Sequence, residues 1–303
     1  MTDTNFITKS VILYYFSGTG NTEYVAKLAL KTFTELGYSA RLAEITDYDH
    51  AENRDYSCEN YDLAGLFYPI HAFNAPKKVN EWTKLGYLKN KPFFIIKTSR
   101  EALSVNDASS LISVKNLKAH GCEFLGEKHV LMPYNIHFRH DDSLVKQMLL
   151  TAQTVTPEFV KKIANGERFA LKPAFYAKLV EATLRPLEQN GARLVGKHLK
   201  AGDGCTGCGA CVAICPNKNV SLAANKNGEK RPVFGKNCMI CMRCVMNCPQ
   251  KAIKITRYLR GWEVCGRYDF KKILADENIS PNYITEDYNG AMKKSYKKYF
   301  LNK

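Results

Sequence analysis

Residues 11–22 read VILYYFSGTGNT. The first six form an almost continuous apolar run of the length of a β-strand, and a loop of glycine and hydroxyl residues follows directly. Apolar residues then recur three or four positions apart from Tyr24 to Leu36, and Gly37 ends this helical pattern. When a strand, a loop and a helix follow one another in this way, backbone N–H groups and the helix N-terminus face an anion. The sequence therefore predicts a phosphate-binding loop at residues 17–22.

The residue types in this loop indicate which class of phosphate site it forms. The loop lacks the lysine of a Walker P-loop and does not match the dinucleotide fingerprint, and an ordinary turn is the competing interpretation. Its hydroxyl residues Ser17, Thr19 and Thr22 place hydrogen-bond donors around the anion, and the loop contains no cationic residue. This arrangement resembles the flavodoxin family, in which an S/T-x-T-G-x-T loop holds the phosphate of FMN. The resemblance implies that the FMN phosphate is bound by Ser17, Gly18, Thr19, Gly20, Asn21 and Thr22.

The rest of the first half of the chain indicates an α/β fold. Apolar runs predict four further strands, at Ala40–Ile45, Leu63–Tyr68, Pro92–Lys97 and Phe124–Met132. Helical patterns lie at Lys77–Leu85, Asn106–His120 and Asp142–Asn165. Five strands that alternate with helices predict a doubly wound, five-stranded parallel sheet covered on both faces. In the flavodoxin-like strand order 2-1-3-4-5, a ligand lies beyond the carboxyl ends of strands one and three.

Two further loops are expected at the flavin ring in this topology. The loop after the third strand contributes Tyr68, Pro69, Ile70, His71, Phe73 and Asn74, and the loop after the fourth contributes Thr98, Ser99, Arg100 and Glu101. Flavodoxins commonly hold the ring between aromatic side chains of these loops, but residues 98–106 contain none. One face of the ring is then open to docking by another part of the chain, or is covered by Leu103 or Val105.

Several other residues in this half have two interpretations. Residues 132–135 follow the fifth strand and either approach the ring or form a plain turn. His71, His137 and His140 titrate near neutral pH and are candidate proton donors, although isolated loop histidines are more often surface residues. We assign catalysis to none of them. Cys58 and Cys122 have no neighbours of a metal-binding type and are expected to be ordinary buried thiols.

Two runs of cysteine mark the second half of the chain. Each has the spacing C-x2-C-x2-C-x3-C-P, in which three thiolates hold one 4Fe-4S cluster and the fourth ligates the other cluster. Zinc is disfavoured by the third cysteine and the following proline, and a disulfide framework is typical of small secreted domains. The crossing pattern assigns Cys205, Cys208, Cys211 and Cys248 to the first cluster, and Cys238, Cys241, Cys244 and Cys215 to the second.

These motifs resemble the bacterial ferredoxins that carry two 4Fe-4S clusters, over Gly202–Thr256. Between the motifs, residues 217–237 contain a turn signal at 225–228 flanked by short extended runs, which predicts an elongated hairpin. Before the motifs, an apolar stripe interrupted by Pro186 and Gly191 predicts two packed helical pieces within Pro173–Lys200, with a flexible tether as the alternative.

We therefore predict four regions: a flavodoxin-like FMN-binding domain at 1–166, a helical linker at 167–200, a 2×[4Fe-4S] ferredoxin domain at 201–256 and a basic extension at 257–303. The extension ends in a run of lysine and tyrosine, Lys293–Phe300, which is usually a solvated helix face or a frayed end. Such a run can instead attract an acidic ferredoxin or flavodoxin.

Composition sets limits on location and partners. No apolar run reaches the length that spans a bilayer, and residues 1–10 lack the features of a signal peptide, so we expect a cytoplasmic protein without a transmembrane segment. The formal charge is +15, and two clusters and a phosphate leave about +9. An acidic redox protein, an anionic membrane surface or nucleic acid could each be attracted by this charge, and the charge alone does not choose among them. We do not expect nucleic acid as a partner, because no recognisable binding motif is present.

The order of the two modules resembles the fused flavodoxin and ferredoxin proteins of anaerobic bacteria and archaea, the EFR1-family ferredoxins. The resemblance implies FMN and two [4Fe-4S] clusters, and an electron-transfer flavoprotein whose partner is an acidic ferredoxin or flavodoxin or a small-molecule acceptor. One alternative is an FMN-dependent reductase of a small organic substrate, with His71 or Tyr134 as proton donor. Another is a redox sensor that acts on nucleic acid through its basic surface.

Overall fold

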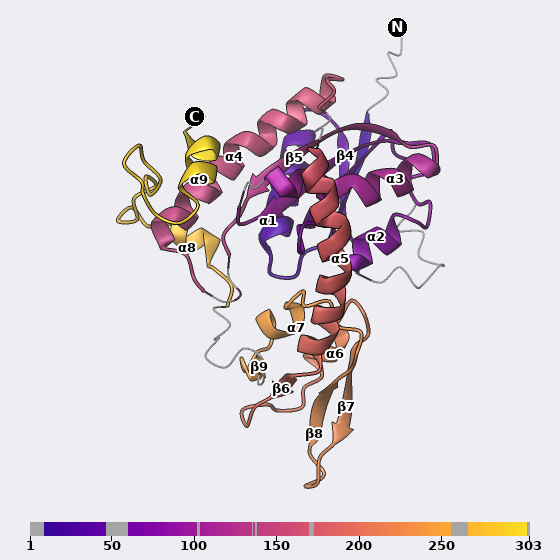
Figure 1. The fold of residues 1–303 in the computed structure, drawn as a ribbon, viewed down its shortest axis with the longest axis vertical. Helices are drawn as coiled ribbons and strands as arrows, with labels where there is room; N and C mark the ends of the chain where they lie inside the picture. Colours follow the sequence, from indigo (N-terminus) through magenta and orange to yellow (C-terminus); the bar gives the residue numbers. More distant parts are fainter. Residues whose placement is uncertain are drawn as a thin grey trace, which may run out of the picture.

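The computed structural model describes residues 9–46, 60–101, 104–134, 136, 138–169, 173–255 and 266–301 (Figure 1). Its first unit contains a sheet of five strands: β1 (Ser10–Tyr15), β2 (Ser39–Glu44), β3 (Leu63–Pro69), β4 (Pro92–Ser99) and β5 (Glu123–Leu131). The strand order is β2-β1-β3-β4-β5 and every pairing is parallel. This is the flavodoxin-like doubly wound order. The predicted fold class is confirmed.

Helices cover both faces of the sheet. They are α1 (Asn21–Glu35), α2 (Lys77–Trp82), α3 (Leu111–Ala119) and α4 (Asp142–Ala164). On one face, α1 and α4 pack Phe33 and Phe159 against the strands. On the other, Trp82 of α2 and Leu117 of α3 join a second core. Strands buried on both faces need apolar residues at successive positions, which is why β1 and β3 are continuous apolar runs.

The predicted helix at Asn106–His120 is in part a different element. Its first part is a 3-10 helix, η2 (Ser104–Ser110), and α3 begins only at Leu111. In η2, the Asn106 side chain donates to the carbonyl oxygen of Glu101 at 3.0 Å, and the Ser109 hydroxyl donates to that of Asn106 at 2.6 Å. Short polar side chains that bond to nearby backbone in this way compete with the α-helical pattern.

The second unit holds the eight cysteines of the two motifs. Its elements are β6 (Leu199–Ala201), α6 (Ala210–Ala213), β7 (Val220–Ala224), β8 (Lys230–Phe234), α7 (Arg243–Met246) and β9 (Ile253–Ile255). Strand β6 pairs with β9, and β7 pairs with β8, both antiparallel. The β7–β8 pair confirms the predicted hairpin, and it extends away from the first unit (Figure 1).

One helix, α5 (Phe175–Gly196), connects the two units, where two helical pieces were predicted. Pro186 lies inside it without ending it. Proline removes one hydrogen bond, and the carbonyl group left without a partner is that of Ala182. Both Ala182 and Pro186 are exposed, so water can bond to this carbonyl oxygen. Among the described residues, no helix is long and apolar enough to cross a membrane.

Residues 266–301 return to the first unit and pack against it through α8 (Phe270–Ala275) and α9 (Lys293–Phe300). The lysine-rich run is therefore no frayed end. Tyr296 is 3% exposed and packs with Leu131 and Met148. The Tyr299 hydroxyl accepts a hydrogen bond from the Leu131 N–H at 3.1 Å. Aromatic residues three and four positions apart give this short helix an apolar face, and its lysines occupy the other.

An ion pair is buried in the sheet beside the carboxyl end of β4. Lys97 of β4 and Glu127 of β5 lie 2.9 Å apart, Nζ to Oε2, and their side chains are 0% and 3% exposed. Lys97 Nζ also donates to the carbonyl oxygen of Asn106 at 3.0 Å. Charges taken out of water are tolerated only when they are paired and hydrogen-bonded. The pair thus joins β4, β5 and η2.

Replacing Lys97 with methionine is expected to lower the free energy of unfolding by about 3–5 kcal/mol, because it leaves the Glu127 carboxylate buried without a partner. Adding Glu127→Leu should restore most of the loss. The matched control is Lys31→Met in the exposed Lys31–Glu35 pair, where we expect a change of less than about 0.5 kcal/mol. Denaturant titration followed by circular dichroism measures these values. Equal effects of the two lysine substitutions would contradict this account.

Candidate functional site

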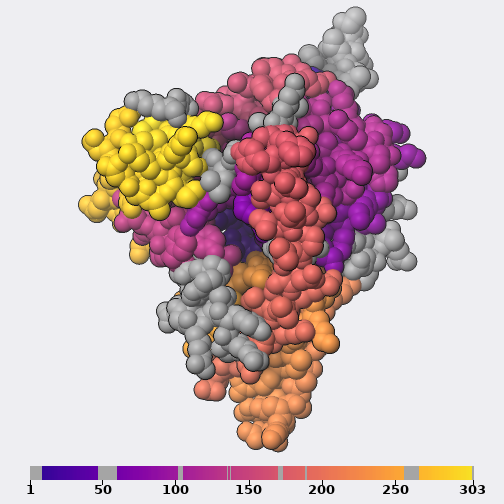
Figure 2. Space-filling view, viewed as in Figure 1, coloured from indigo at the N-terminus to yellow at the C-terminus, as the bar shows by residue number. Residues whose placement is uncertain are grey.

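A cavity of about 410 Å³ opens at the carboxyl edge of the sheet, where the loops after β1, β3, β4 and β5 meet. Its volume is within the range of small-molecule sites. In Figure 2 the indigo N-terminal part of the chain is visible at the bottom of a recess beside α5. Ile240 and Cys241 of the second unit also line the cavity. The site is therefore built from both units.

Most residues predicted to bind a flavin line this cavity. These are Ser17, Gly18, Thr19, Asn21, Thr22, Pro69, Ile70, His71, Phe73, Thr98, Ser99, Arg100 and Glu101. Three predicted residues do not line it: Gly20, Tyr68 and Asn74. Gly20 is the N-cap of α1, and Tyr68 is fully buried in the sheet. The Asn74 side chain is hydrogen-bonded to neighbouring side chains.

The loop after β1 has the geometry of an anion site. Gly20 precedes α1 with a φ of 98°, which is left-handed and favours glycine, and its N–H donates to the Ser17 hydroxyl at 3.1 Å. The hydroxyl groups of Thr22 and Thr98 lie 2.8 Å apart and are buried. The Asn21 amide donates to the carbonyl oxygen of Pro133 at 2.6 Å, while its Oδ1 is buried without a partner among the described residues. Polar atoms thus gather at the N-terminus of a 15-residue helix.

The loop after β3 is held in an unusual shape. His71 and Asn74 exchange backbone hydrogen bonds of 2.8 and 2.9 Å, and between them Ala72 and Phe73 have positive φ angles of 39° and 67°. Asn74 donates to the Glu181 carboxylate of α5 and accepts from Asn80 at 2.9 Å. Residues rarely adopt such angles unless their surroundings impose them, and such strain clusters at functional sites. Here the strained backbone conformation places His71 and Phe73 at the cavity.

Two aromatic side chains face the cavity from the loop after β5. The rings of Tyr134 and Phe138 lie 4.7 Å apart, and the Arg100 guanidinium is 5.5 and 5.1 Å from their centres. Arg100 also pairs with Glu101. Tyr134 follows the residues Met132 and Pro133, which line the cavity as the sequence suggested. Phe138 was not predicted, because no periodic pattern in the sequence marks it.

Histidines near the site are neutral at pH 7. Burial lowers the pKa of His71, which lines the cavity, to about 4. Burial together with the charge of Lys97 lowers the pKa of His129 to about 3, and its Nε2 lies 2.7 Å from the Ser99 hydroxyl. His140 does not line the cavity. His137, Leu103, Asn135 and Cys58 lie outside the described residues.

The eight motif cysteines surround two smaller cavities, four at each. Cys215, Cys238, Cys241 and Cys244 line one of about 30 Å³, the inner cysteine cavity. Cys205, Cys208, Cys211 and Cys248 line one of about 20 Å³, the outer cysteine cavity. These are the two ligand sets of the predicted crossing pattern. The four thiols at each cavity match the donor set of a 4Fe-4S cluster.

Backbone N–H groups point at the sulfurs in the same way in both repeats. Asn219 N–H donates to Cys215 Sγ at 3.2 Å, and Ala252 N–H donates to Cys248 Sγ at 3.3 Å. Hydrogen bonds to cluster sulfurs are one means by which a protein sets reduction potentials. Burial raises the pKa of Cys241 to about 12, so a thiolate there needs a bound cation to compensate.

The inner cysteine cavity lies against the first unit. The carbonyl oxygen of Cys241 occupies the place where a Cβ atom at residue 18 would be, so only glycine fits there. Glu44 of β2 and Arg243 of α7 form an ion pair of 2.6 Å across the same interface. Gly196, at the end of α5, approaches Cys238 so closely that it too admits no side chain. The second unit therefore docks at the large cavity.

Comparison with known proteins supports the interpretation of the second unit. Residues 204–252 match the family model described as 4Fe-4S dicluster domain. All eight motif cysteines lie within this range. The second unit is a ferredoxin-like 4Fe-4S domain. No curated protein sequence matches the chain.

Solved structures of flavodoxins align with about half of the chain. The Streptococcus pneumonia TIGR4 flavodoxin has 16% identity and a TM-score of 0.37, with 52% of this chain and 98% of that chain covered. Flavodoxin 2 from Bacillus cereus has 16% identity and a TM-score of 0.38, with coverages of 52% and 98%. The WrbA-like flavodoxin from Agrobacterium tumefaciens has 14% identity and a TM-score of 0.37, with coverages of 53% and 100%. The flavodoxin-like fold of the first unit is established by its strand order, independently of these alignments.

Replacing Cys208 with serine is expected to remove about half of the iron and acid-labile sulfide of the purified protein, because the outer cysteine cavity loses one of its four thiols. The matched control is Cys122→Ser. Cys122 is a buried thiol that donates to the carbonyl oxygen of Leu88 and lines neither cysteine cavity. Iron and sulfide analysis after anaerobic reconstitution gives the result. Full iron content in the Cys208 variant would refute the ligand assignment.

Proposed function

We propose that the chain is an electron-transfer iron–sulfur flavoprotein, with FMN in the large cavity and a [4Fe-4S] cluster in each cysteine cavity. The main support is that Ile240 and Cys241 line the same cavity as the phosphate loop, so the two kinds of centre would be neighbours. FMN exchanges one or two electrons and each cluster exchanges one, so together they link two-electron and one-electron partners.

The position of each cysteine set gives the electron path an order. The inner set includes Cys241, which lines the flavin cavity, and Cys238, which touches the end of α5. The outer set includes Cys208, the one exposed thiol among the eight motif cysteines. In our proposal, electrons pass between FMN, the inner cluster, the outer cluster and a partner at the surface near Cys208. No proton needs to move along this path.

Ile240 has a specific part in this proposal. Its φ of 48° is left-handed, a conformation that β-branched residues rarely adopt, and the residue lines the cavity. The equivalent position in the first cysteine repeat is Gly207, with a φ of 67°. An isoleucine in this strained position supports the idea that its side chain covers the flavin ring where the loop after β4 offers no aromatic residue.

The C-terminal segment adds a cation to the proposed FMN phosphate site. The guanidinium carbon of Arg267 lies 3.9 Å from the place where a Cβ atom at Gly20 would be, and Gly20 is the N-cap of α1. The Arg267 residue is exposed and can approach a bound phosphate from the solvent side. The sequence did not indicate this role, because residue 267 is distant in the chain and follows no phosphate-binding motif.

Replacing Arg267 with glutamine is expected to weaken FMN binding about two- to fivefold at low ionic strength, because one favourable charge interaction is lost. The effect should shrink as salt is added. Riboflavin, which lacks the phosphate, should bind both proteins equally. Lys271→Gln, on the same segment, is the matched control. Fluorescence titration of each apoprotein with FMN and with riboflavin measures the affinities, and an equal loss for riboflavin would exclude a phosphate contact.

Replacing Gly18 with alanine tests the proposed electron path directly. The added methyl group collides with the carbonyl oxygen of Cys241 and forces the two units apart, so electron transfer between FMN and the inner cluster should slow about tenfold or more. Iron content should not change. Gly191→Ala, which has open space around the added atom, is the control. Anaerobic laser-flash photoreduction follows the internal transfer, and unchanged kinetics with FMN fully bound would contradict the path.

A second candidate function is an FMN-dependent reductase of a small organic substrate that receives electrons from the clusters. His71 and Tyr134, the proton donors considered for such a site, both line the cavity. An anaerobic turnover assay distinguishes the two functions. Sustained reduction of an organic acceptor, lost in His71→Gln while ferredoxin reduction persists, would favour the reductase.

We further propose that the protein belongs with the EFR1-family ferredoxins and acts in the cytoplasm. The order of the two units supports the family. The cytoplasm is supported because exposed clusters require a reducing compartment. The proposed partners are an acidic ferredoxin or flavodoxin, or a small-molecule acceptor.

A further inference from the structure

Two lysines face each other on the short β6–β9 pair of the second unit. Lys200 and Lys254 are directly opposite in the antiparallel register, and both are exposed. Like charges in this position destabilise a strand pair. Neither lysine forms an ion pair with a carboxylate among the described residues. An oppositely charged or an apolar pair would stabilise the strands more, whereas the two lysines place positive charge on this face.

Both lysines lie on the solvent face of a strand pair whose other face reaches the outer cysteine cavity. Ile253, next to Lys254, lines that cavity, so alternation along the strand turns Lys254 and its partner Lys200 outward. Lys251 N–H donates to the carbonyl oxygen of Cys248 at 3.0 Å. The carbonyl oxygen of Lys230 lies 2.5 Å from the place of a Cβ atom at Gly207, between two of the cavity's cysteines. We call Lys200, Lys230, Lys251 and Lys254 the basic rim; all four residues are exposed.

One apolar side chain accompanies the basic rim. Leu222 lines the outer cysteine cavity and is 37% exposed. Cys208, another lining residue, is exposed as well. An apolar centre beside a polar, charged edge is the usual composition of a protein-binding surface. This surface also covers the point at which a cluster would come nearest to solvent.

We propose that the basic rim, with Leu222, is the docking surface for an acidic one-electron carrier protein. This inference rests on the proposed electron-transfer function. Positive charge around a cluster steers a negatively charged protein to it and orients the redox centre toward Cys208. In the transfer step, the reduced carrier loses one electron and the outer cluster gains it. No bond forms or breaks, and no proton is exchanged.

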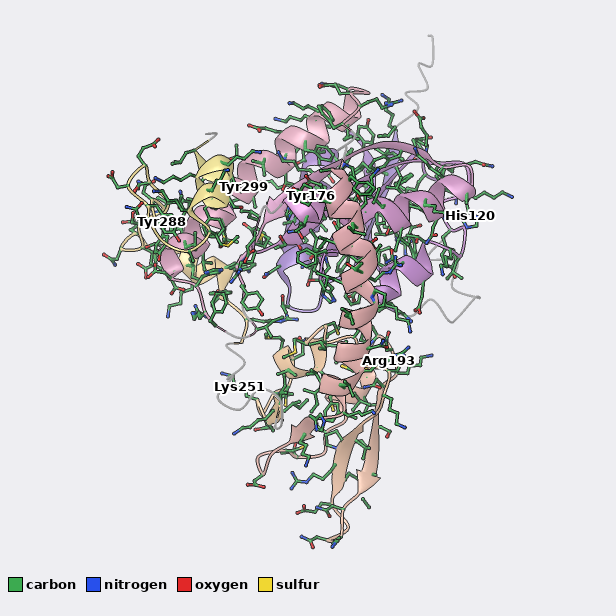
Figure 3. All side chains as sticks on the ribbon, in the orientation of Figure 1. His120, Tyr176, Arg193, Lys251, Tyr288 and Tyr299 are labelled. Carbon is green, nitrogen blue, oxygen red and sulfur yellow. The ribbon has the colours of Figure 1, made fainter. Side chains whose placement is uncertain are left out.

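The lysine-rich α9 is the rival surface for such a partner. It packs on α4 and β5 of the first unit. Figure 3 shows Lys251 on the second unit, well away from Tyr288 and Tyr299 of the C-terminal segment. A carrier bound at α9 would face neither cysteine cavity, because the aromatic residues of α9 pack against Leu131 and Met148. Reversing the charge of a lysine on α9 therefore serves as the matched control for the same change on the basic rim.

The test uses Lys200→Glu in the holoprotein, with a reduced plant-type [2Fe-2S] ferredoxin as the acidic probe. The second-order rate constant for cluster reduction should fall about tenfold at low ionic strength, and the difference should vanish at high salt. Photoreduced deazaflavin, a small neutral reductant, should reduce both proteins at the same rate. The unfolding midpoint should rise, because a Glu–Lys pair replaces a Lys–Lys pair across β6 and β9.

Lys294→Glu makes the same change of charge on α9 and should leave the ferredoxin rate unchanged. Equal slowing by Lys294→Glu and Lys200→Glu would mean that net charge, not the basic rim, attracts the carrier, and would overturn the proposal. An unchanged rate in Lys200→Glu would overturn it too, as would salt-sensitive binding of single-stranded DNA at the rim that excludes ferredoxin. Failure of deazaflavin electrons to pass between FMN and clusters in the unmodified protein would instead refute the proposed function.

Discussion

The contact between the phosphate loop and the inner cysteine loop determines how the two units are arranged. At Gly18 the backbones of the loops touch, since the Cys241 carbonyl oxygen occupies the space of a side chain. A backbone contact of this kind leaves almost no freedom in the separation of the units. At the edge of the same interface, Glu44 and Arg243 form an ion pair of 2.6 Å. Rigid placement matters here because a flavin and a cluster exchange electrons only when they are close.

Helix α5 supports the same arrangement from the other side. Near its middle, Glu181 accepts a hydrogen bond from Asn74 of the cavity loop and pairs with Arg185 at 3.1 Å. Burial raises the pKa of this carboxyl group, and its two partners compensate for the lost hydration. At its end, Gly196 packs directly on Cys238. The helix thus connects the loop beside the large cavity to a cysteine of the inner cysteine cavity, and Figure 3 shows it running between the units from Tyr176 to Arg193.

The sequence predicted features that depend on local patterns. The continuous apolar run at 11–16 follows from one constraint, a strand buried on both faces, and β1 is that strand. The cysteine spacing predicts two sets of four thiols, and the structure brings four cysteines together at each of two cavities. Features that depend on distant residues were missed. Arg267 reaches the phosphate loop only because the C-terminal segment returns to the first unit, and Phe138 joins Tyr134 through the path of an irregular loop. For Pro186, local propensity was misleading, because exposure of Ala182 lets water replace the lost hydrogen bond.

The two cysteine repeats have the same backbone but different side chains, and the difference follows the geometry of the site. Gly207 and Gly209 have left-handed φ angles in the first repeat, where the loop faces the hairpin and solvent. The equivalent positions of the second repeat are Ile240 and Met242, with φ angles of 48° and 59°. Glycine at these positions would avoid the strain. Instead, Ile240 lines the large cavity and Met242 is buried in the core of the second unit. At these two positions, strain is therefore accepted only in the repeat that faces the first unit, which implies that the loop's packing on the cavity outweighs its local conformational cost.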